Sequence, residues 1–316
     1  MRVVFMGSSD LSVIILGKLV EAGYEIVKVY TRADKPAGRG QKPTPPPLKE
    51  AALRMGLSVY QPATIRTPEE VEKFRQLKPD LCVVAAYGRL IPEDMLDIPS
   101  LKFINVHPSM LPKYRGPSPI IAPILAGDEE TGVTIFVLDE GMDTGPILAQ
   151  RSVGISPEDT ADTLSQKLSR LGAQLLLETI PKWSGGEIAP RPQDDSQATQ
   201  THILKKEEGS LDWSRPAVEL CRQVRAFQPW PGSFTIWKGR LLKVLACETM
   251  ESPVEGEPGR ILLVHDPRDP GKTLPSVQTG EGLLVLRRLQ VEGRRPLEGH
   301  IFVLGERDFG GSRLGD

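Results

Sequence analysis

The sequence predicts an α/β protein with an open, mostly parallel β-sheet covered by helices and a second, smaller β-barrel domain. Two observations support this fold class. Residues 1–188 alternate short β-rich apolar runs with segments whose apolar residues recur at helical spacing, whereas residues 207–316 contain mainly short β-rich runs between turn residues. A chain of 316 residues with 39% hydrophobic content is long enough for each part to bury its own core.

The first domain is expected to alternate strands with helices. Its β-rich apolar runs are Val3 to Met6, Glu25 to Tyr30, Leu81 to Ala85, Phe103 to Val106 and Val133 to Leu138. Its helical spacing falls on Leu11 to Ala22, Leu48 to Met55, Val71 to Leu77 and Ala161 to Ile180. Ligands of open sheets of this kind bind beyond the carboxyl ends of the strands, so functional residues are expected at that edge.

Residues 189–206 are expected to form a linker, because this polar stretch lacks the apolar periodicity that packing requires. One helix is expected after it, from Ala217 to Ala226. The β-rich runs that follow are Phe234 to Trp237, Leu241 to Leu245, Ile261 to Val264 and Leu283 to Leu289. Turn residues separate these runs, which favours a small β-barrel.

The charge of the chain excludes a protein that coats nucleic acid by bulk electrostatics. Its formal net charge is −2, whereas such binding needs many Lys and Arg side chains to replace condensed counterions. A nucleic-acid partner would have to be held by a local patch. The candidate patch contains Arg32, Lys35, Arg39 and Lys42, opposed only by Asp34.

The remaining composition favours a cytoplasmic enzyme without a metal. The longest apolar runs fall far short of the roughly 20 residues that span a bilayer. The N-terminus begins directly with a predicted strand, and the absence of a signal-like or Arg- and Ser-rich leader favours a bacterial cytoplasmic protein. Three widely spaced cysteines indicate reduced thiols, and four scattered histidines show no metal-ligand spacing.

Three polar residues follow two neighbouring strands of the first domain. Asn105 and His107 stand two residues apart at the end of a predicted strand, where positions i and i+2 share one face. Asp143 lies in a glycine-rich turn after the next apolar strand. Each residue alone is more often a turn residue bonded to its own backbone. Together, however, they place an amide, an imidazole and a carboxylate where ligands bind.

This arrangement resembles the catalytic set of the 10-formyltetrahydrofolate-dependent formyltransferases. The segment from Ser109 to Gly116 is similar to the signature loop of that family, with Met110 where leucine is commoner, and the match extends from Phe5 to Gly315. The resemblance implies a Rossmann-like first domain and an OB-like C-terminal barrel. It also implies that Asn105, His107 and Asp143 are catalytic.

The resemblance further implies that 10-formyltetrahydrofolate is the formyl donor and that no metal takes part. Two stretches match those that line the folate site in the family. The first contains Ser109, Met110, Leu111 and Pro112, and the second contains Tyr87, Gly88, Arg89, Leu90 and Ile91.

The acceptor implied by the resemblance is charged initiator methionyl-tRNA, bound by a monomeric enzyme with no DNA or membrane partner. The loop that carries Arg32, Lys35, Arg39 and Lys42 resembles the one that tRNA-specific members insert at the acceptor end, and residues 207–316 resemble their tRNA-binding domain. A sugar-nucleotide formyltransferase and a formyltetrahydrofolate hydrolase are the alternatives within the family. A non-catalytic RNA-binding module would leave the three strand-end residues unused.

Trp230, between two prolines at the start of the second domain, is expected to be a buried anchor rather than a surface for stacking a base. A basic RNA-binding face of this domain would have to be created by its geometry. Its candidate residues are Lys238, Arg240, Lys243, Arg287, Arg288, Arg294 and Arg295.

Overall fold

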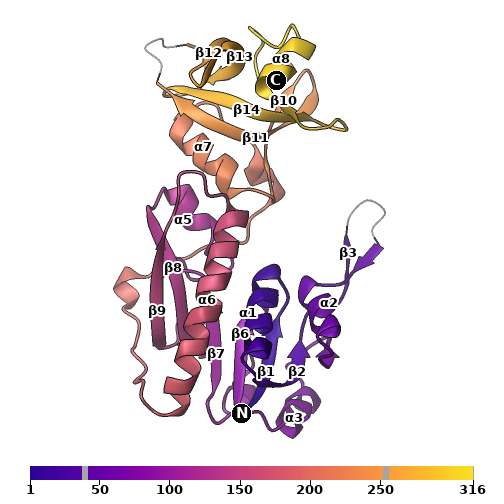
Figure 1. The fold of residues 1–316 in the computed structure, drawn as a ribbon, viewed down its shortest axis with the longest axis vertical. Helices are drawn as coiled ribbons and strands as arrows, with labels where there is room; N and C mark the ends of the chain where they lie inside the picture. Colours follow the sequence, from indigo (N-terminus) through magenta and orange to yellow (C-terminus); the bar gives the residue numbers. More distant parts are fainter. Residues whose placement is uncertain (38–41, 252–255, 316) are drawn as a thin grey trace. The chain divides into compact units, whose positions relative to one another are not determined.

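The structure is a computed structural model and describes residues 1–37, 42–251 and 256–315. The chain divides into two compact units (Figure 1). The first unit comprises Met1–Ile120, Glu129–Gly154 and Leu164–His202. The second comprises Ile121–Asp128, Ile155–Thr163 and Ile203–Asp316, so two short segments from the N-terminal half belong to it.

A seven-stranded sheet forms the centre of the first unit, in the order β5-β2-β1-β6-β7-β8-β9. Its strands are β1 Arg2–Gly7, β2 Glu25–Tyr30, β5 Val59–Tyr60, β6 Leu81–Ala85, β7 Phe103–His107, β8 Glu130–Val137 and β9 Ile147–Gly154. The first five in this order run parallel, and β8 and β9 continue the sheet antiparallel. The predicted mostly parallel α/β sheet is therefore confirmed.

The central strands are buried on both faces, as parallel strands under helices usually are. Every residue of β6 is buried, and so is every residue of β1 after Arg2. The helices of this part of the chain are α1 Asp10–Glu21, α2 Pro47–Arg54, α3 Pro68–Gln76, α4 Glu93–Leu96 and α6 Ala161–Ser184. Gly172 lets α6 lie close to β7, because a Cβ there would stand 2.8 Å from Cγ1 of Val106.

The segment that follows α6 is hydrogen-bonded to the first unit, although its composition favours a linker. Arg191 exchanges two backbone hydrogen bonds with Ile147, at 2.8 and 2.9 Å. Further along, the backbone of Arg115 pairs with Thr199 and Thr201, and a 3₁₀ turn covers Asp195–Gln197. This segment is held by polar contacts, so its attachment leaves no apolar pattern in the sequence.

An antiparallel sheet forms the centre of the second unit, with the path β10-β11-β14-β13-β12 and β15 paired to β14. Its strands are β10 Ser233–Trp237, β11 Arg240–Met250, β12 Ile261–Asp266, β13 Asp269–Gln278, β14 Leu283–Val291 and β15 Leu297–Glu298. Its helices are α5 Ile121–Ala126, α7 Ala217–Ala226 and α8 Gly299–Gly305, with a 3₁₀ turn at Lys206–Gly209.

The C-terminal segment links the two end strands of this sheet. The Ser312 carbonyl accepts from Ile261 N–H of β12, and Gly315 N–H donates to the Ile236 carbonyl of β10, both at 2.9 Å. Trp237 and Phe309 pack edge to face inside, with ring centroids 5.0 Å apart. These links join β12 to β10 across the open side, in keeping with the predicted barrel-like second domain.

Several elements differ from the sequence predictions. Two long strands, β9 and β13, were not expected, and β13 contains two prolines and a glycine that hide its strand character. The prediction for Trp230 is wrong, because its side chain is 55% exposed rather than buried. Among the residues that the structure describes, no helix is long and apolar enough to cross a membrane.

Most of the candidate basic residues of the second unit are paired with acids. Lys238 pairs with Asp308, and Arg294 with Glu306. Arg288 lies 3.9 Å from Glu298. These pairs reduce the positive charge that the candidate residues could contribute to a basic face of this unit.

A partly buried ion cluster joins three strands of the second unit. Arg287 on β14 donates to Asp266 at the end of β12, with Nη1 2.5 Å from Oδ2, and also to Glu248 on β11. The Arg287 hydrogen bond holds the pKa of Asp266 at about 2, below its ordinary value of 3.8. The ionised carboxylate is therefore the form that the folded state stabilises.

We predict that Asp266→Asn lowers the free energy of unfolding at pH 7. Because the folded pKa of Asp266 is depressed, its contribution is fully present above about pH 4 and disappears as the pH falls through about 2. Urea denaturation between pH 7 and pH 2 should give a difference between wild type and variant that shrinks over this range. Asp308→Asn, which breaks an exposed pair, should change little. A difference that stays constant down to pH 2 would contradict the role of the ionised carboxylate.

Candidate active site

The end of β7 brings the predicted amide and imidazole to the carboxyl edge of the first-unit sheet. Asn105 pairs with Val84 of β6 on one side and with Phe136 of β8 on the other. His107 is the last residue of β7 and lies opposite Thr134. Both residues are thus fixed by the central strands rather than by a loop.

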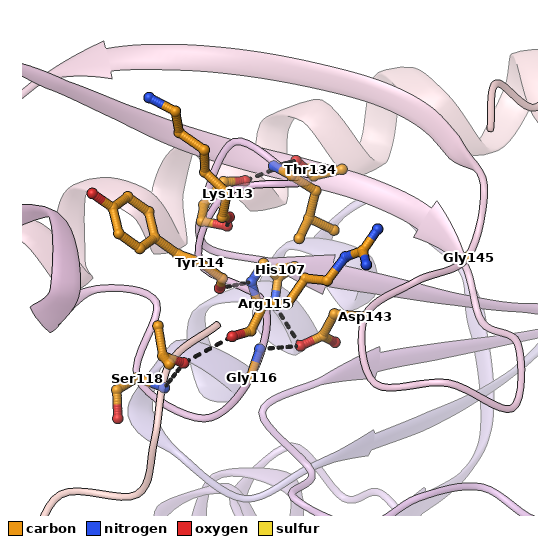
Figure 2. Close-up of polar contacts among 12 residues, drawn as sticks. His107, Lys113, Tyr114, Arg115, Gly116, Ser118, Thr134, Asp143 and Gly145 are labelled. Atoms are coloured by element: carbon orange, nitrogen blue, oxygen red, sulfur yellow. Dashed lines mark hydrogen bonds and ion pairs between the residues drawn. The ribbon is translucent and has the colours of Figure 1, made fainter. Parts of the chain in front are cut away.

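The His107 ring is buried between two oxygen atoms (Figure 2). Its Nε2 lies 3.0 Å from the backbone carbonyl of Tyr114, and its Nδ1 lies 3.6 Å from Oδ2 of Asp143. A carbonyl oxygen can only accept, so Nε2 carries a proton in this arrangement. The Asp143 carboxylate faces the other ring nitrogen.

Asp143 is held in an unusual backbone conformation beside this ring. Its φ is +59°, a region that costs a non-glycine residue about 1–3 kcal/mol. Its Oδ2 accepts a hydrogen bond of 2.8 Å from the backbone N–H of Gly116. Figure 2 shows the carboxylate between Gly116 and His107. The structure thus brings together His107 and Asp143, which are far apart in the sequence.

The glycine-rich turn around Asp143 is fixed by its own contacts. The Asp139 side chain accepts from Gly141 N–H at 3.1 Å and from the Thr144 hydroxyl at 2.7 Å. A Cβ on Gly145 would overlap the Val137 carbonyl, so only glycine fits there. The glycines therefore serve the close return of the chain after β8.

Asn105 presents an amide group that the protein does not use. Its Oδ1 is buried and has no hydrogen-bond partner within the described parts of the chain. Leaving such a group without a partner costs about 1–3 kcal/mol. A partly buried side chain of this kind, next to His107, is typical of a site that completes its hydrogen bonds with a ligand.

The stretch from Ser109 to Pro112 forms a tightly bonded loop that follows Asn105 and His107 in the chain. The Ser109 hydroxyl donates to the Lys113 carbonyl at 2.7 Å, and Leu111 N–H donates to the Thr134 hydroxyl at 3.0 Å. Ser109 and Leu111 are buried, whereas Met110 and Pro112 are half-buried. The loop is therefore held in one conformation by its own hydrogen bonds, and one of these uses the Ser109 hydroxyl as donor.

The second predicted folate stretch follows β6 at the same edge of the sheet. Tyr87 is buried, which raises the pKa of its phenol, and Ile91 packs on the same core cluster. Gly88 has a φ of +70° and accepts a hydrogen bond from Arg32. Leu90 is 48% exposed.

A depression of about 230 Å³ borders this second stretch. The side chain of Arg89 donates to the Pro62 carbonyl at 3.0 Å and lines one wall. The depression is lined by Ala63, Thr64, Ile65, Arg66, Arg89 and Leu90. Two arginines and no carboxylate among these residues make it a place suited to an anion.

The structure describes only part of the predicted basic patch. Lys35 is exposed on β3 Lys35–Ala37, which pairs with β4 Lys42–Thr44. Arg32 is half-buried, and its guanidinium donates a hydrogen bond to the Gly88 carbonyl. Arg39 lies outside the described residues, as does the side chain of Lys42.

Asp34, the only acid near this patch, is already compensated. Its carboxylate accepts from Gln61 at 2.7 Å and pairs with Lys49 at 2.7 Å. These hydrogen bonds, first from Gln61 and then from Lys49, lower the pKa of Asp34. The carboxylate therefore does not neutralise the patch.

Sequence reasoning missed three residues that support the site. Arg115 is buried, and both Gln193 and Thr199 come from the polar segment after α6. Their side chains contact the loops that carry His107 and Asp143. The only sequence signal was the high density of Gln, Asp and Thr in that segment, which composition alone assigns to a linker.

No group of three or more His, Cys, Asp or Glu side chains that could hold a metal is found among the described residues. The three cysteines are free thiols. The site residues Asn105, His107 and Asp143 carry groups that can transfer protons and stabilise negative charge on an oxygen atom.

Solved structures with this fold are formyltransferases and related folate-binding proteins. The N-formyltransferase from Helicobacter canadensis, in complex with folinic acid and dTDP-3-aminofucose, has a TM-score of 0.66 at 19% identity, covering 90% of this chain and 98% of that one. HypX from Aquifex aeolicus in complex with tetrahydrofolic acid has a TM-score of 0.63 at 19% identity, covering 96% of this chain and 47% of that one.

The family follows from the sequence comparisons. Residues 1–180 match the formyl transferase model, and residues 203–307 match the model of the formyl transferase C-terminal domain. The methionyl-tRNA formyltransferase of Chloroflexus aggregans is 47% identical, over 96% of this chain and 97% of the relative. That of Bacillus subtilis is 43% identical, over 99% and 98%. The chain belongs to the formyl transferase family.

Proposed function

We propose that this protein transfers the formyl group of 10-formyltetrahydrofolate to the α-amino group of methionyl initiator tRNA. The observation that carries the proposal is the buried His107–Asp143 pair beside the unpartnered Asn105 amide. Relatives named methionyl-tRNA formyltransferase match the chain over nearly its whole length, which supports this acceptor over the others.

The donor site is proposed to lie between the two loops at the carboxyl edge of the sheet, Ser109–Pro112 and Tyr87–Ile91. The Oδ1 of Asn105 is buried and has no hydrogen-bond partner among the described residues, so it can still accept a hydrogen bond from a ligand. The depression at Arg66 and Arg89 suits the carboxylates at the glutamate end of folate. Tetrahydrofolate binding by a solved structure of this fold supports the same donor.

In the proposed mechanism, the α-amine of the acceptor attacks the formyl carbon directly. An α-amino group has a pKa of about 7.7–8, so an appreciable fraction is neutral at pH 7 and no enzyme nucleophile is required. Negative charge then develops on the formyl oxygen. Asn105 and His107 supply N–H donors for that oxygen, and Asp143 orients His107 and accepts the amine proton directly or through water. The intermediate then collapses with cleavage of the bond from the formyl carbon to N10, which takes up the proton that the amine lost, and tetrahydrofolate leaves.

His107 requires one change to act as a donor in this scheme. Its Nε2 already donates to the Tyr114 carbonyl at 3.0 Å. Stabilising the substrate oxygen therefore means sharing this proton or exchanging the Tyr114 carbonyl for the substrate. The unpartnered atom of Asn105 is its Oδ1, which only accepts, so the donor for the substrate oxygen is its NH2 group.

Residues 1–188 are proposed to form the catalytic domain, and residues 207–316 are proposed to bind tRNA. Lys35 and the loop that it begins would contact the acceptor end, together with Arg39 and Lys42. Arg32 is proposed to connect this loop with the folate stretch through Gly88. We propose a monomeric enzyme of the bacterial cytoplasm, where its relatives' acceptor, methionyl-tRNA, is made and used.

We predict transfer of radiolabelled formyl from 10-formyltetrahydrofolate to charged initiator methionyl-tRNA. Uncharged tRNA should receive no label, because it lacks the nucleophilic amine. A UDP-linked 4-amino sugar and water serve as the competing acceptors. Label on the sugar, or formate released without any acceptor, would overturn the proposed acceptor but keep the catalytic residues.

We predict that Asn105→Ala, His107→Ala and Asp143→Ala each lower kcat by about a hundredfold or more, because each removes a group that acts on charge in the transition state. Thermal unfolding should stay close to that of the wild type. Asp97→Asn, which removes an exposed carboxylate that pairs with Lys102, is the control and should turn over normally. Any of the three variants that retains nearly full turnover is removed from the proposed set.

The exposure of Trp230 changes its proposed role from domain anchor to tRNA contact. The loop behind it is fixed, because Gly232 N–H donates to the Phe227 carbonyl at 2.9 Å and Phe227 is buried. The exposed indole is thus carried by a fixed backbone, and aromatic side chains of this kind are ones on which bases stack. Lys243 is exposed on β11, opposite Phe234 of β10.

We predict that Trp230→Ala weakens tRNA binding by roughly 5- to 150-fold, the range of about 1–3 kcal/mol for one stacked base. Folate affinity should not change. Filter binding with charged tRNA and folate titration measure the two separately. Leu304→Ala removes another exposed apolar side chain of the same unit, 73% exposed, and should leave both affinities unchanged. Unaltered tRNA binding by Trp230→Ala would remove this residue from the interface.

A further inference from the structure

Gln193 connects the polar segment after α6 to the turn that carries Asp143. Its Nε2 donates two hydrogen bonds, to the backbone carbonyls of Asp143 at 2.9 Å and Gly145 at 2.8 Å. Its Oε1 accepts two from Arg115, at 3.1 Å from Nε and 2.8 Å from Nη2. Both amide protons and both lone pairs of the oxygen are thereby used.

Arg115 determines which way this amide faces. A guanidinium group can only donate, so Gln193 must turn its oxygen toward Arg115 and its NH2 toward the turn. Arg115 itself is buried and is held by a second partner, Asp195, at 2.7 Å. The Asp195 side chain is 82% exposed and compensates the charge of Arg115 away from the active site.

The turn needs such a support because Asp143 occupies a strained conformation. Residues with φ near +60° persist where the surrounding structure holds them in place. The backbone of Asp143 is held by Gln193, and its side chain is held by Gly116, the neighbour of Arg115. Arg115, acting through Gln193, thus fixes the backbone of Asp143, and the adjacent Gly116 fixes its carboxylate.

We propose that Gln193 is a positioning residue, which holds the turn so that the Asp143 carboxylate faces His107. The Asp143 carboxylate stands 3.6 Å from His107 Nδ1, and Gln193 acts on this carboxylate through the Asp143 backbone. This inference rests on the proposed function, because it assigns Gln193 a role through a catalytic Asp143. It also gives one side chain of the polar segment after α6 a part in catalysis beyond connecting the two units.

The substitution Gln193→Glu separates this role from support of the fold. The carboxylate keeps a partner for Arg115 but has no N–H for the Asp143 and Gly145 carbonyls. We expect kcat to fall by about tenfold to a hundredfold, since a displacement of about 1 Å at a reacting group has effects of that size. KM for folate and for charged tRNA should stay within about twofold.

Asp195→Asn is the matched control. It removes the charge of the other Arg115 partner and leaves both Gln193 donors in place. Its kcat should equal that of the wild type. If Gln193→Glu lowers the unfolding temperature, Gln193→Met, which keeps the length of the side chain without its donors, is measured in the same way.

A double-mutant cycle tests whether Gln193 acts through Asp143. In an Asp143→Ala background, single-turnover rates should fall by less than about twofold on adding Gln193→Glu, because the carboxylate to be positioned is already gone. An equal loss in both backgrounds, or normal kcat of Gln193→Glu itself, overturns the positioning role. If Asp143→Ala alone turns over normally, the catalytic set proposed above fails as well, which distinguishes the two failures.

Discussion

The hydrogen bond from Gly116 N–H to the Asp143 carboxylate is the contact on which the site depends. It joins the loop after β7 to the turn after β8, although the antiparallel pairing of these strands places the end of β8 beside the start of β7. The Tyr114 carbonyl, two residues earlier in the first loop, faces the other side of His107. This contact thus ties the turn that carries Asp143 to the loop that follows His107.

This contact requires the Asp143 turn to fold back along β7. The end of β8 lies beside the start of β7, because Val137 is opposite Ile104 and Leu138 N–H donates to the Phe103 carbonyl, whereas His107 is at the other end of β7. Here β8 returns antiparallel, and the turn that holds Asp143 lies between β8 and its hairpin partner β9. Asn105 and His107 stay on a central strand, which gives them the rigidity that catalytic groups require. Asp143 gains its fixed position from neighbouring loops instead.

Much of this arrangement could be predicted from the sequence, and the exceptions have physical causes. Asn105 and His107 were found because a strand fixes residues i and i+2 on one face, and α7 was found with its observed ends, Ala217 to Ala226, because its apolar spacing is regular. Gln193 and Arg115 were missed because a hydrogen bond between distant polar residues has no periodicity. The exposure of Trp230 was missed because packing of a tryptophan depends on tertiary neighbours.

Non-glycine residues with positive φ occur both before and after the strands of the first unit. Lys78 and Lys102 have positive φ and precede strands at the amino edge, where each completes a turn. Ala86 and Tyr114 have positive φ in the loops after β6 and β7, at the carboxyl edge, and Asp143 has positive φ in the turn after β8 that reaches His107. The unpartnered Oδ1 of Asn105 is on β7. Strain and unsatisfied polarity are thus concentrated where the substrates are proposed to bind. Ligand contacts can recover part of that free energy, so this edge is expected to gain more stability from substrates than the rest of the sheet.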